Sequence, residues 1–161
     1  MIRPPQVKDA AAVCRIYNHF ITETTVTFAT DPVPDEEMAD TIAQVTDKFP
    51  WVVWEDGGEV LGYAAASEWK SRCAYRYSVE TTIYLAPEAA GRGVGTALYG
   101  ELLEQVEAAG HHSALGGIAL PNPASVALHE KLGFFKVGHL REVGRKFDQW
   151  VDVGYWQKIF V

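Results

Sequence analysis

The chain has 161 residues, 48% of them apolar and 22% charged, a composition typical of one soluble globular domain spanning residues 1–161. Its formal net charge of −7 argues against nucleic acid as a partner, and it contains no apolar run of the roughly 18 residues that a transmembrane helix needs. Cys14 and Cys73 make neither a disulfide framework nor a zinc site, and the N-terminal residues do not resemble a secretory signal, so we expect a cytoplasmic protein without a metal.

The first half of the chain shows helical and strand-like patterns in turn. Apolar residues recur at helical spacing before position 22, and the acids that begin at Asp35 favour a helix start. The turn Asp56-Gly57-Gly58 separates two β-branched and aromatic runs, which predicts a hairpin. In chain order we expect a strand at 2–4, a helix at 8–21, a loop at 22–33, a helix at 35–47 and hairpin strands at 51–54 and 60–65.

The second half alternates strands and helices until two strands close the chain. Gly133 follows a short helical segment and is a common residue at a helix C-terminus. We expect a strand at 77–85, a helix from 94 to about 110, a strand at 113–120, a helix at 125–132 and strands at 134–143 and 151–160. This order indicates one mixed α/β sheet flanked by helices.

The most informative segment joins the strand at 77–85 to the helix that begins at Val94. Gly91, Gly93 and Gly95 alternate there, so the backbone can pass close to a ligand and adopt positive φ. The unpaired N–H groups of the first helical turn, with the helix dipole, then face that ligand. This arrangement favours the binding of a phosphate group.

Two common phosphate-binding motifs do not fit this segment. The P-loop pattern G-x-x-x-x-G-K-S/T is absent. The dinucleotide pattern G-x-G-x-x-G lacks its third glycine, and the following strand at 114–120 carries no carboxylate for a ribose. A dinucleotide-binding oxidoreductase is therefore only an alternative, which a thermal-shift test for NAD(P) binding would decide.

The glycine segment resembles the acyl-CoA pyrophosphate loop of the GNAT acetyltransferases, whose pattern is Q/R-x-x-G-x-G/A. Gly93 and Gly95 fill its two small positions, and Ala90 stands where the family prefers Gln or Arg. A second block agrees, because Asn122 precedes a short helix that ends in Leu-Gly-Phe at 132–134. The resemblance implies a mostly antiparallel sheet of about seven strands with about four helices. It also implies that acetyl-CoA contacts Ile83, Tyr84, Leu85, Gly91, Arg92, Gly93, Val94, Gly95, Thr96 and Asn122.

Within that superfamily the chain resembles the phosphinothricin and methionine sulfoximine acetyltransferases along almost its whole length. The matching stretches are 16–19, 49–51, 69–70, 79–80, Thr82, 120–122, 129–130 and 144–152. The resemblance implies transfer of acetyl from acetyl-CoA to the α-amine of a small amino acid, such as L-phosphinothricin, L-methionine sulfoximine or methionine sulfone. It further implies direct attack in a ternary complex and a homodimer whose aromatic C-terminal end packs near the partner's active site.

Two side chains are candidates for the proton transfers of this reaction. Glu80 is a carboxylate inside a β-branched strand, where it either faces solvent, pairs with an arginine or acts as a base. The resemblance assigns it the general base, and partial burial would bring its pKa toward the working pH. His129 stands where most GNAT enzymes have a tyrosine that protonates the departing thiolate. An imidazole can fill that role, or it can simply pack within the helix.

The acceptor site is expected around the polar segment before the strand at 77–85. Lys70 and Arg72 are able to hold a carboxylate, although an ordinary solvated loop has the same composition. Phe28 is a candidate pocket wall or an ordinary packing residue. The resemblance places five further residues in the acceptor pocket: Cys73, Ala74, Tyr75, Thr81 and Thr82.

Other functions fit parts of this pattern. The acceptor could be another small amine or a protein N-terminus, because few side chains set the selectivity of such a pocket. A non-catalytic acyl-CoA-binding module would need neither Glu80 nor His129, so the presence of both favours an enzyme.

Overall fold

A seven-stranded sheet forms the centre of the protein, and the computed structural model describes all residues 1–161. The strands are β1 (Ile2–Arg3), β2 (Trp51–Asp56), β3 (Glu59–Glu68), β4 (Ser78–Leu85), β5 (Ser113–Leu120), β6 (Phe135–Lys146) and β7 (Gln149–Ile159). The helices are α1 (Ala10–Glu23), α2 (Asp35–Val45), α3 (Val94–Ala108) and α4 (Pro123–Lys131), with short 3₁₀ turns η1 (Val7–Asp9), η2 (Cys73–Tyr75) and η3 (Pro87–Ala89). The predicted number and order of the main elements is confirmed, and none of the helices is long and apolar enough to cross a bilayer.

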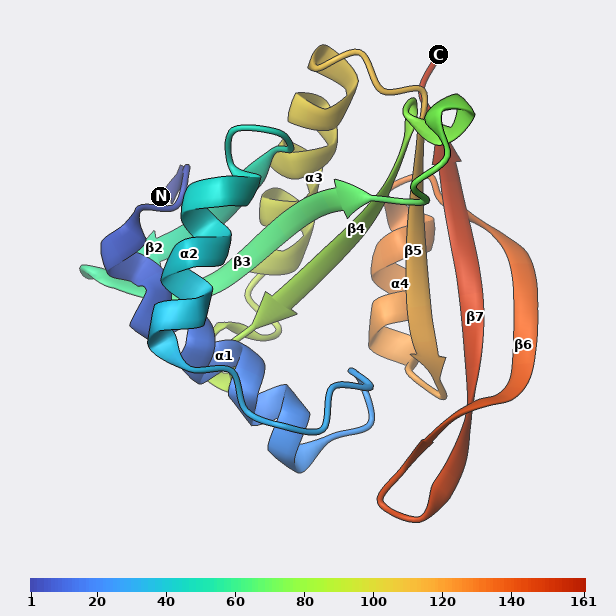
Figure 1. Ribbon diagram of the computed structural model, residues 1–161, viewed down its shortest axis with the longest axis horizontal. Helices are drawn as coiled ribbons and strands as arrows, with labels where there is room; N and C mark the ends of the chain where they lie inside the picture. The colour runs from blue at the N-terminus through green and yellow to red at the C-terminus, as the bar shows by residue number, and fades with distance from the viewer.

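The sheet has one irregular place, between β4 and β5. Its strand order is β1-β2-β3-β4-β5-β7-β6, and β4 and β5 are the only parallel neighbours. They pair over Ser78–Glu80 and Ser113–Leu115 alone and then diverge, which leaves a wedge-shaped gap in the sheet (Figure 1). The backbone groups of β4 that face this gap have no ladder partner on β5, so they are open to a ligand.

Each face of the sheet carries its own hydrophobic core. Helices α1 and α2 cover one face, where Val13 and Ile42 are buried against β2 and β3. Helices α3 and α4 lie on the other face, and the fully buried Leu98 and Leu102 of α3 pack there because residues four apart share one side of a helix. Together the two layers hold the gap between β4 and β5 in a fixed position.

The C-terminal hairpin differs from the prediction. The two strands extend to a turn of only two residues, Phe147 and Asp148, which have φ of 51° and 58°. Positive φ at both central residues is the geometry of a tight hairpin turn, which glycine, asparagine and aspartate usually form, so a turn that contains Phe147 is hard to predict from composition. A bulge between Leu140 and Gly144 also breaks the alternation in β6.

An ion-pair network ties the N-terminal residues to the sheet. The guanidinium of Arg3 donates to both carboxylate oxygens of Asp9, at 2.8 and 3.0 Å, and to Glu55 at 2.6 Å. The backbone N–H of Gln6 also donates to Asp9, at 2.7 Å. These charge-assisted bonds join β1, η1 and β2, and they hold the pKa of the buried Asp9 carboxyl below its usual value.

Asp9→Asn is expected to lower the free energy of unfolding by about 1–3 kcal/mol at neutral pH, the usual range for a lost hydrogen bond to a charged group. Because the folded pKa of Asp9 is lowered, its contribution is complete above the unfolded pKa and is lost as the pH falls through the folded value. Urea unfolding at several pH values should therefore show a deficit that disappears in strong acid. Asp40→Asn, at an exposed position in α2, is the control. A deficit independent of pH would contradict this assignment.

Candidate active site

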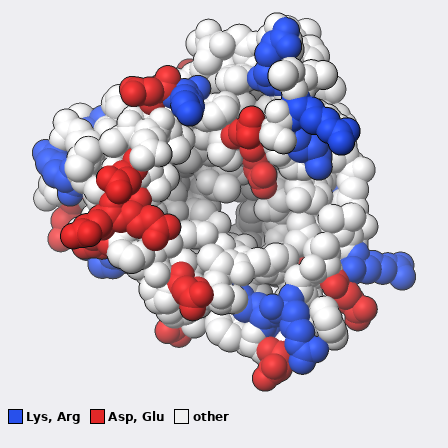
Figure 2. All heavy atoms as spheres, in the orientation of Figure 1, with Lys and Arg blue, Asp and Glu red and all other residues white.

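The gap between β4 and β5 opens into a pocket on the side of α3 and α4. It is lined from β4 by residues 81–84, from β5 by residues 117–119, and from α4 and its N-cap by Asn122, Ser125 and His129. Seen from the side of α1 and α2, the space-filling view shows the molecule hollowed at its centre over the same gap (Figure 2). The first pocket therefore lies where β4 has an unpaired edge.

A second pocket, of about 300 Å³, lies on the other side of the gap. Its walls are mostly apolar and come from the loop after α1, from β4 and from the strands β5 to β7. Both pockets are lined by Val26, Thr82, Tyr84, Gly117 and Ala119. Because they share these walls, two ligands entering from opposite faces of the sheet would meet at the gap.

Glu80 is the acidic side chain of the second pocket. It lies on β4 and lines the pocket together with Thr82 and Tyr84, as alternation along a strand requires. The carboxyl is half-buried, and this burial raises its pKa above the usual value. No arginine or lysine offsets the effect, so the predicted alternative of an ion pair does not apply. A half-buried carboxylate without a cation is suited to accept a proton.

The glycine segment forms the expected turn before α3. Gly91 and Gly93 have φ of 74° and 77°, and nothing lies within 4 Å of the position where a Cβ would stand on either residue. Gly93 caps α3 without a side-chain hydrogen bond. The N–H groups of the first turn of α3 thus remain available for an anion, and the open space above them fits a phosphate group.

The neighbouring predicted cofactor residues have different surroundings. The guanidinium of Arg92 lies 2.9 Å from Asp56 in an exposed ion pair. The side chain of Val94 is buried in the core, and Leu85 packs against Gly62 and Gly95, so these residues can offer a ligand only their backbone. Thr96 lies on α3 in a partly exposed position.

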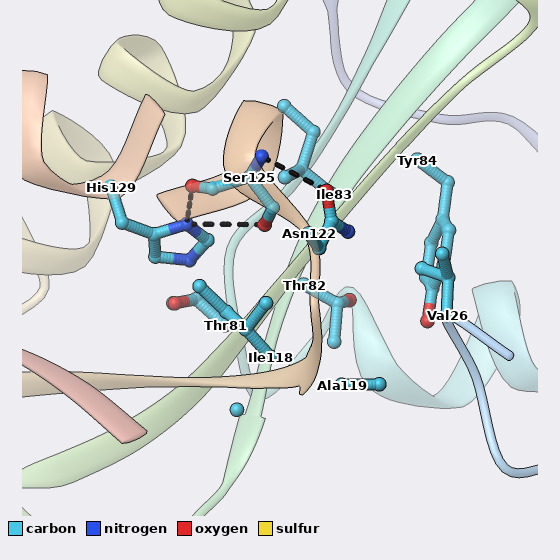
Figure 3. Close-up of a pocket in the computed structure, with 11 residues that line it drawn as sticks. Val26, Thr81, Thr82, Ile83, Tyr84, Ile118, Ala119, Asn122, Ser125 and His129 are labelled. Carbon is cyan, nitrogen blue, oxygen red and sulfur yellow. Dashed lines mark hydrogen bonds between the residues drawn. The ribbon is translucent and has the colours of Figure 1, made fainter. Parts of the chain in front are cut away.

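His129 lies in a chain of buried polar groups beside the first pocket. Its Nε2 is 3.0 Å from the hydroxyl of Tyr99. Its Nδ1 is 2.7 Å from the carbonyl oxygen of Ser125, a contact drawn in Figure 3. The Tyr99 hydroxyl is in turn 2.7 Å from Oγ1 of Thr81. The ring is only 4% exposed, and burial lowers the pKa of its imidazole, while the bond to the Ser125 carbonyl acts in the opposite direction.

The start of α4 is fixed by Asn122. Its Oδ1 accepts a hydrogen bond from the backbone N–H of Ser125 at 3.2 Å, which is the usual N-cap interaction. Figure 3 shows Asn122 and Ser125 on the wall of the first pocket, near Ile83 of β4. This cap sets the direction of α4 and thereby the position of His129.

The predicted acceptor residues fall into two groups. Phe28 and Thr82 lie with Glu80 in the second pocket, whereas Thr81 points to the opposite face of β4. Lys70, Arg72 and Tyr75 line a separate, open pocket with Ser71, and Cys73 and Ala74 are exposed on η2.

The segment at 69–77 is therefore not part of either pocket at the gap. Trp69 packs edge-on against Tyr155 of β7, with ring centroids 5.6 Å apart, and holds the segment over that strand. The Nζ of Lys70 lies 5.3 Å from the centre of the Trp69 ring. Tyr155, which contacts Trp69, lines the second pocket, whereas the basic side chains of the segment line the separate, open pocket.

Several lining residues were not predicted. Leu140, Val143, Val153 and Tyr155 close the second pocket from the C-terminal hairpin. One signal was present in the sequence: adjacent glycines inside a strand mark a close approach of other atoms. In β5, a Cβ on Gly116 would lie 2.5 Å from Nε2 of His129, and one on Gly117 would lie 3.2 Å from the Tyr155 ring.

Comparisons with known proteins identify the family of this chain. The model of the acetyltransferase (GNAT) family matches residues 13–134. The chain is 45% identical over 159 residues to the phosphinothricin N-acetyltransferase of Streptomyces viridochromogenes, covering 99% of this chain and 87% of that protein. It is 34% identical over 157 residues to the L-methionine sulfoximine/L-methionine sulfone acetyltransferase of Salmonella typhimurium, covering 97% of this chain and 92% of that protein.

A solved structure shares the whole fold. The phosphinothricin acetyltransferase of Sinorhizobium meliloti, determined in complex with acetyl-CoA, has a TM-score of 0.96 to this chain at 35% identity, covering 99% of this chain and 88% of that one. The gap in the sheet, the glycine turn and these matches lead to one conclusion. The chain belongs to the GNAT acetyltransferase family.

Proposed function

We propose that the protein transfers the acetyl group of acetyl-CoA to the α-amine of a small amino acid, by direct attack in a ternary complex. The observation that carries this proposal is the pair of pockets that meet at the gap between β4 and β5. Acetyl-CoA would occupy the first pocket, with its pyrophosphate on the glycine turn. The amine would enter the second pocket, where Glu80 is the carboxylate without a cation.

The chemistry needs a proton acceptor, a stabilised oxyanion and a proton donor. In our proposal Glu80 accepts the proton of the attacking ammonium group, and its raised pKa improves it as a base. The unpaired backbone N–H groups of β4 after Glu80 stabilise the oxyanion of the tetrahedral intermediate. His129, on the wall of the first pocket, gives a proton to the departing thiolate, and for this step one of its ring N–H groups exchanges its partner, Tyr99 or the Ser125 carbonyl, for the sulfur.

The acceptor class follows from the second pocket and from the relatives. A pocket of about 300 Å³ with mostly apolar walls fits a side chain of the size of methionine or phosphinothricin. The named relatives act on phosphinothricin and on methionine sulfoximine and sulfone. Lys70 and Arg72 belong to the segment that Trp69 joins to Tyr155, a residue of this pocket, and we propose that they attract the carboxylate of the amino acid.

We further propose a cytoplasmic homodimer. Seven large apolar side chains of the C-terminal hairpin are exposed: Phe135, Val137, Leu140, Val143, Phe147, Trp150 and Ile159. Two of them, Leu140 and Val143, also line the second pocket, so a partner on this surface would complete its wall. Sedimentation of the purified protein tests this assembly.

Free thiol should appear when the protein is mixed with acetyl-CoA and L-phosphinothricin, L-methionine sulfoximine or methionine sulfone. The same assay should include ordinary amino acids, other small amines and a peptide with a free N-terminus. Arg72→Gln should raise the KM of the amino acid and leave the KM of acetyl-CoA unchanged. Release with other amines alone would overturn the acceptor class. Binding of acetyl-CoA without release from any amine would favour an acyl-CoA-binding module.

A further inference from the structure

A line of buried hydroxyl groups leads from His129 to the backbone of β5. Thr81 of β4, Tyr99 of α3 and His129 of α4 are linked by contacts of 2.7 and 3.0 Å. All three residues are buried, so their hydrogen bonds are made to one another rather than to bulk water. The line also has a fixed acceptor at each end: the carbonyl oxygen of Ser125, 2.7 Å from Nδ1, and that of Leu115, 3.4 Å from Thr81 Oγ1.

The proton positions in the neutral state follow from these contacts. A carbonyl oxygen can only accept, so Nδ1 of His129 must carry a proton toward Ser125. Nε2 of the neutral ring is then an acceptor, and the Tyr99 hydroxyl donates to it. The Tyr99 oxygen in turn accepts from the hydroxyl of Thr81. In the neutral state, therefore, the hydroxyl groups of Thr81 and Tyr99 both donate in the direction of His129.

The line can also hold the charged state. When Nε2 takes up a proton, it becomes a donor and the Tyr99 oxygen can accept from it. The Tyr99 hydroxyl then turns to the oxygen of Thr81, and the Thr81 hydroxyl turns to the carbonyl of Leu115. One N–H bond forms, two hydroxyl groups rotate, and no buried polar atom loses its partner. Without these rotations the imidazolium would leave a buried donor unpaired, which is costly.

We propose that Tyr99 and Thr81 are positioning residues that allow the buried His129 to gain and lose a proton during acetyl transfer. This inference rests on the proposed function for its role in catalysis, but the reversible line of hydroxyl groups is a property of the protein alone. It explains why polar groups of three different elements converge in an otherwise apolar layer.

The pKa of His129 is set by burial and by hydrogen bonds rather than by charged side chains. Tyr99 faces the ring from α3, and burial raises the pKa of its phenol, so it stays neutral. The ring also contacts Phe134 and the backbone of Gly116. Burial is the largest influence on the pKa of His129 and lowers it, and the Ser125 carbonyl is the group that counteracts it. Neither influence comes from a charged side chain.

The titration of His129 by NMR tests this inference in the wild type, Thr81→Val and Thr81→Ser, with the signal assigned by its loss in His129→Asn. Thr81→Val keeps the Tyr99–His129 bond but removes the acceptor for the rotated Tyr99 hydroxyl. We expect the pKa of His129 to fall by about one unit or more, a roughly tenfold loss of proton affinity. Thr81→Ser should restore it, and Tyr99→Phe should lower it further.

Two results would overturn the inference. One is a His129 pKa that is equal in the wild type and in Thr81→Val. The other is a wild-type ring that stays neutral until the protein unfolds in acid. The titration needs no acceptor amine, so the two proposals fail separately. Shifted titrations without any acetyl transfer would contradict the proposed function, whereas acetyl transfer with unshifted titrations would contradict the role of Tyr99 and Thr81.

Discussion

Glu80→Gln should lower the rate of acetyl transfer by about 10²–10⁴-fold, the usual contribution of a general base. The amide keeps the size of the side chain but cannot take a proton from the attacking amine. Because Glu80 lines the second pocket and not the first, the affinity for acetyl-CoA should remain unchanged. Steady-state kinetics with a saturating amino acid, together with titration of acetyl-CoA binding, separate these effects. Glu59→Gln, at an exposed position at the start of β3, is the matched control.

The pH dependence of the rate and of the stability provides a second test of the role of Glu80. Burial raises its folded pKa, so the wild-type rate should fall as the pH drops through that raised value. A raised pKa also means that the folded state binds the proton more tightly than the unfolded state does. Stability therefore decreases as the pH rises from the unfolded to the folded pKa, and the charged carboxylate costs stability at neutral pH. Glu80→Gln should raise the melting temperature at neutral pH while it abolishes turnover.

A different result would remove Glu80 from the mechanism. If the variant keeps a wild-type rate, or if it loses activity only because it no longer binds acetyl-CoA, the base is another group. A fall in the melting temperature would indicate that the carboxylate supports the fold instead. The combination of a more stable protein and a lost rate is typical of a side chain that serves a reaction.

Gly116→Ala should displace His129 and lower the rate by about 10²-fold, if the loss equals that of a general acid. A Cβ at this position would lie 2.5 Å from Nε2 and 2.8 Å from Cδ2 of the ring. The ring is held by Tyr99 on one side and by Ser125 on the other, so it cannot move without breaking a hydrogen bond. Overpacking of this kind costs about 1–3 kcal/mol of stability.

The control for this substitution is Gly100→Ala in α3, where a Cβ would meet nothing within 4 Å. There alanine should stabilise the helix by about 0.5–1 kcal/mol. Kinetics and chemical unfolding of both variants, with the ring signal of His129 followed by NMR, test the prediction. An unchanged His129 signal and an unchanged rate in Gly116→Ala would show that the ring has room to shift and that its position does not limit the reaction.

The sequence was most informative about features that depend only on residues close together in the chain. The glycine turn, the start of α3 and the helix end at Gly133 each depend on neighbouring residues, and all three are present. The place of the 69–77 segment depends on a contact between Trp69 and Tyr155, which lie far apart in the chain. Nothing in the local pattern indicates that contact.

The C-terminal hairpin and the role of Tyr99 show the same limit. The turn at Phe147–Asp148 has positive φ without a glycine, so turn composition could not place it. Tyr99 sits in an apolar helix face and reads as an ordinary core residue. Its partners come from β4 and α4, and only the assembled layers bring the three side chains together.

The position of the two pockets on opposite faces of one sheet has a consequence for how such enzymes diversify. The walls of the second pocket, where we propose that the amine binds, come largely from the loop after α1 and from the C-terminal hairpin, whereas the first pocket is lined mainly by β4, β5 and α4. Phe28, Leu140 and Val143 line the second pocket alone, so mutations at these positions can accumulate without changing the walls of the first. In an enzyme built this way, natural selection can change which amine is accepted while the site proposed for acetyl-CoA stays the same. A laboratory library with substitutions confined to the loop and the hairpin would sample the same changes in acceptor.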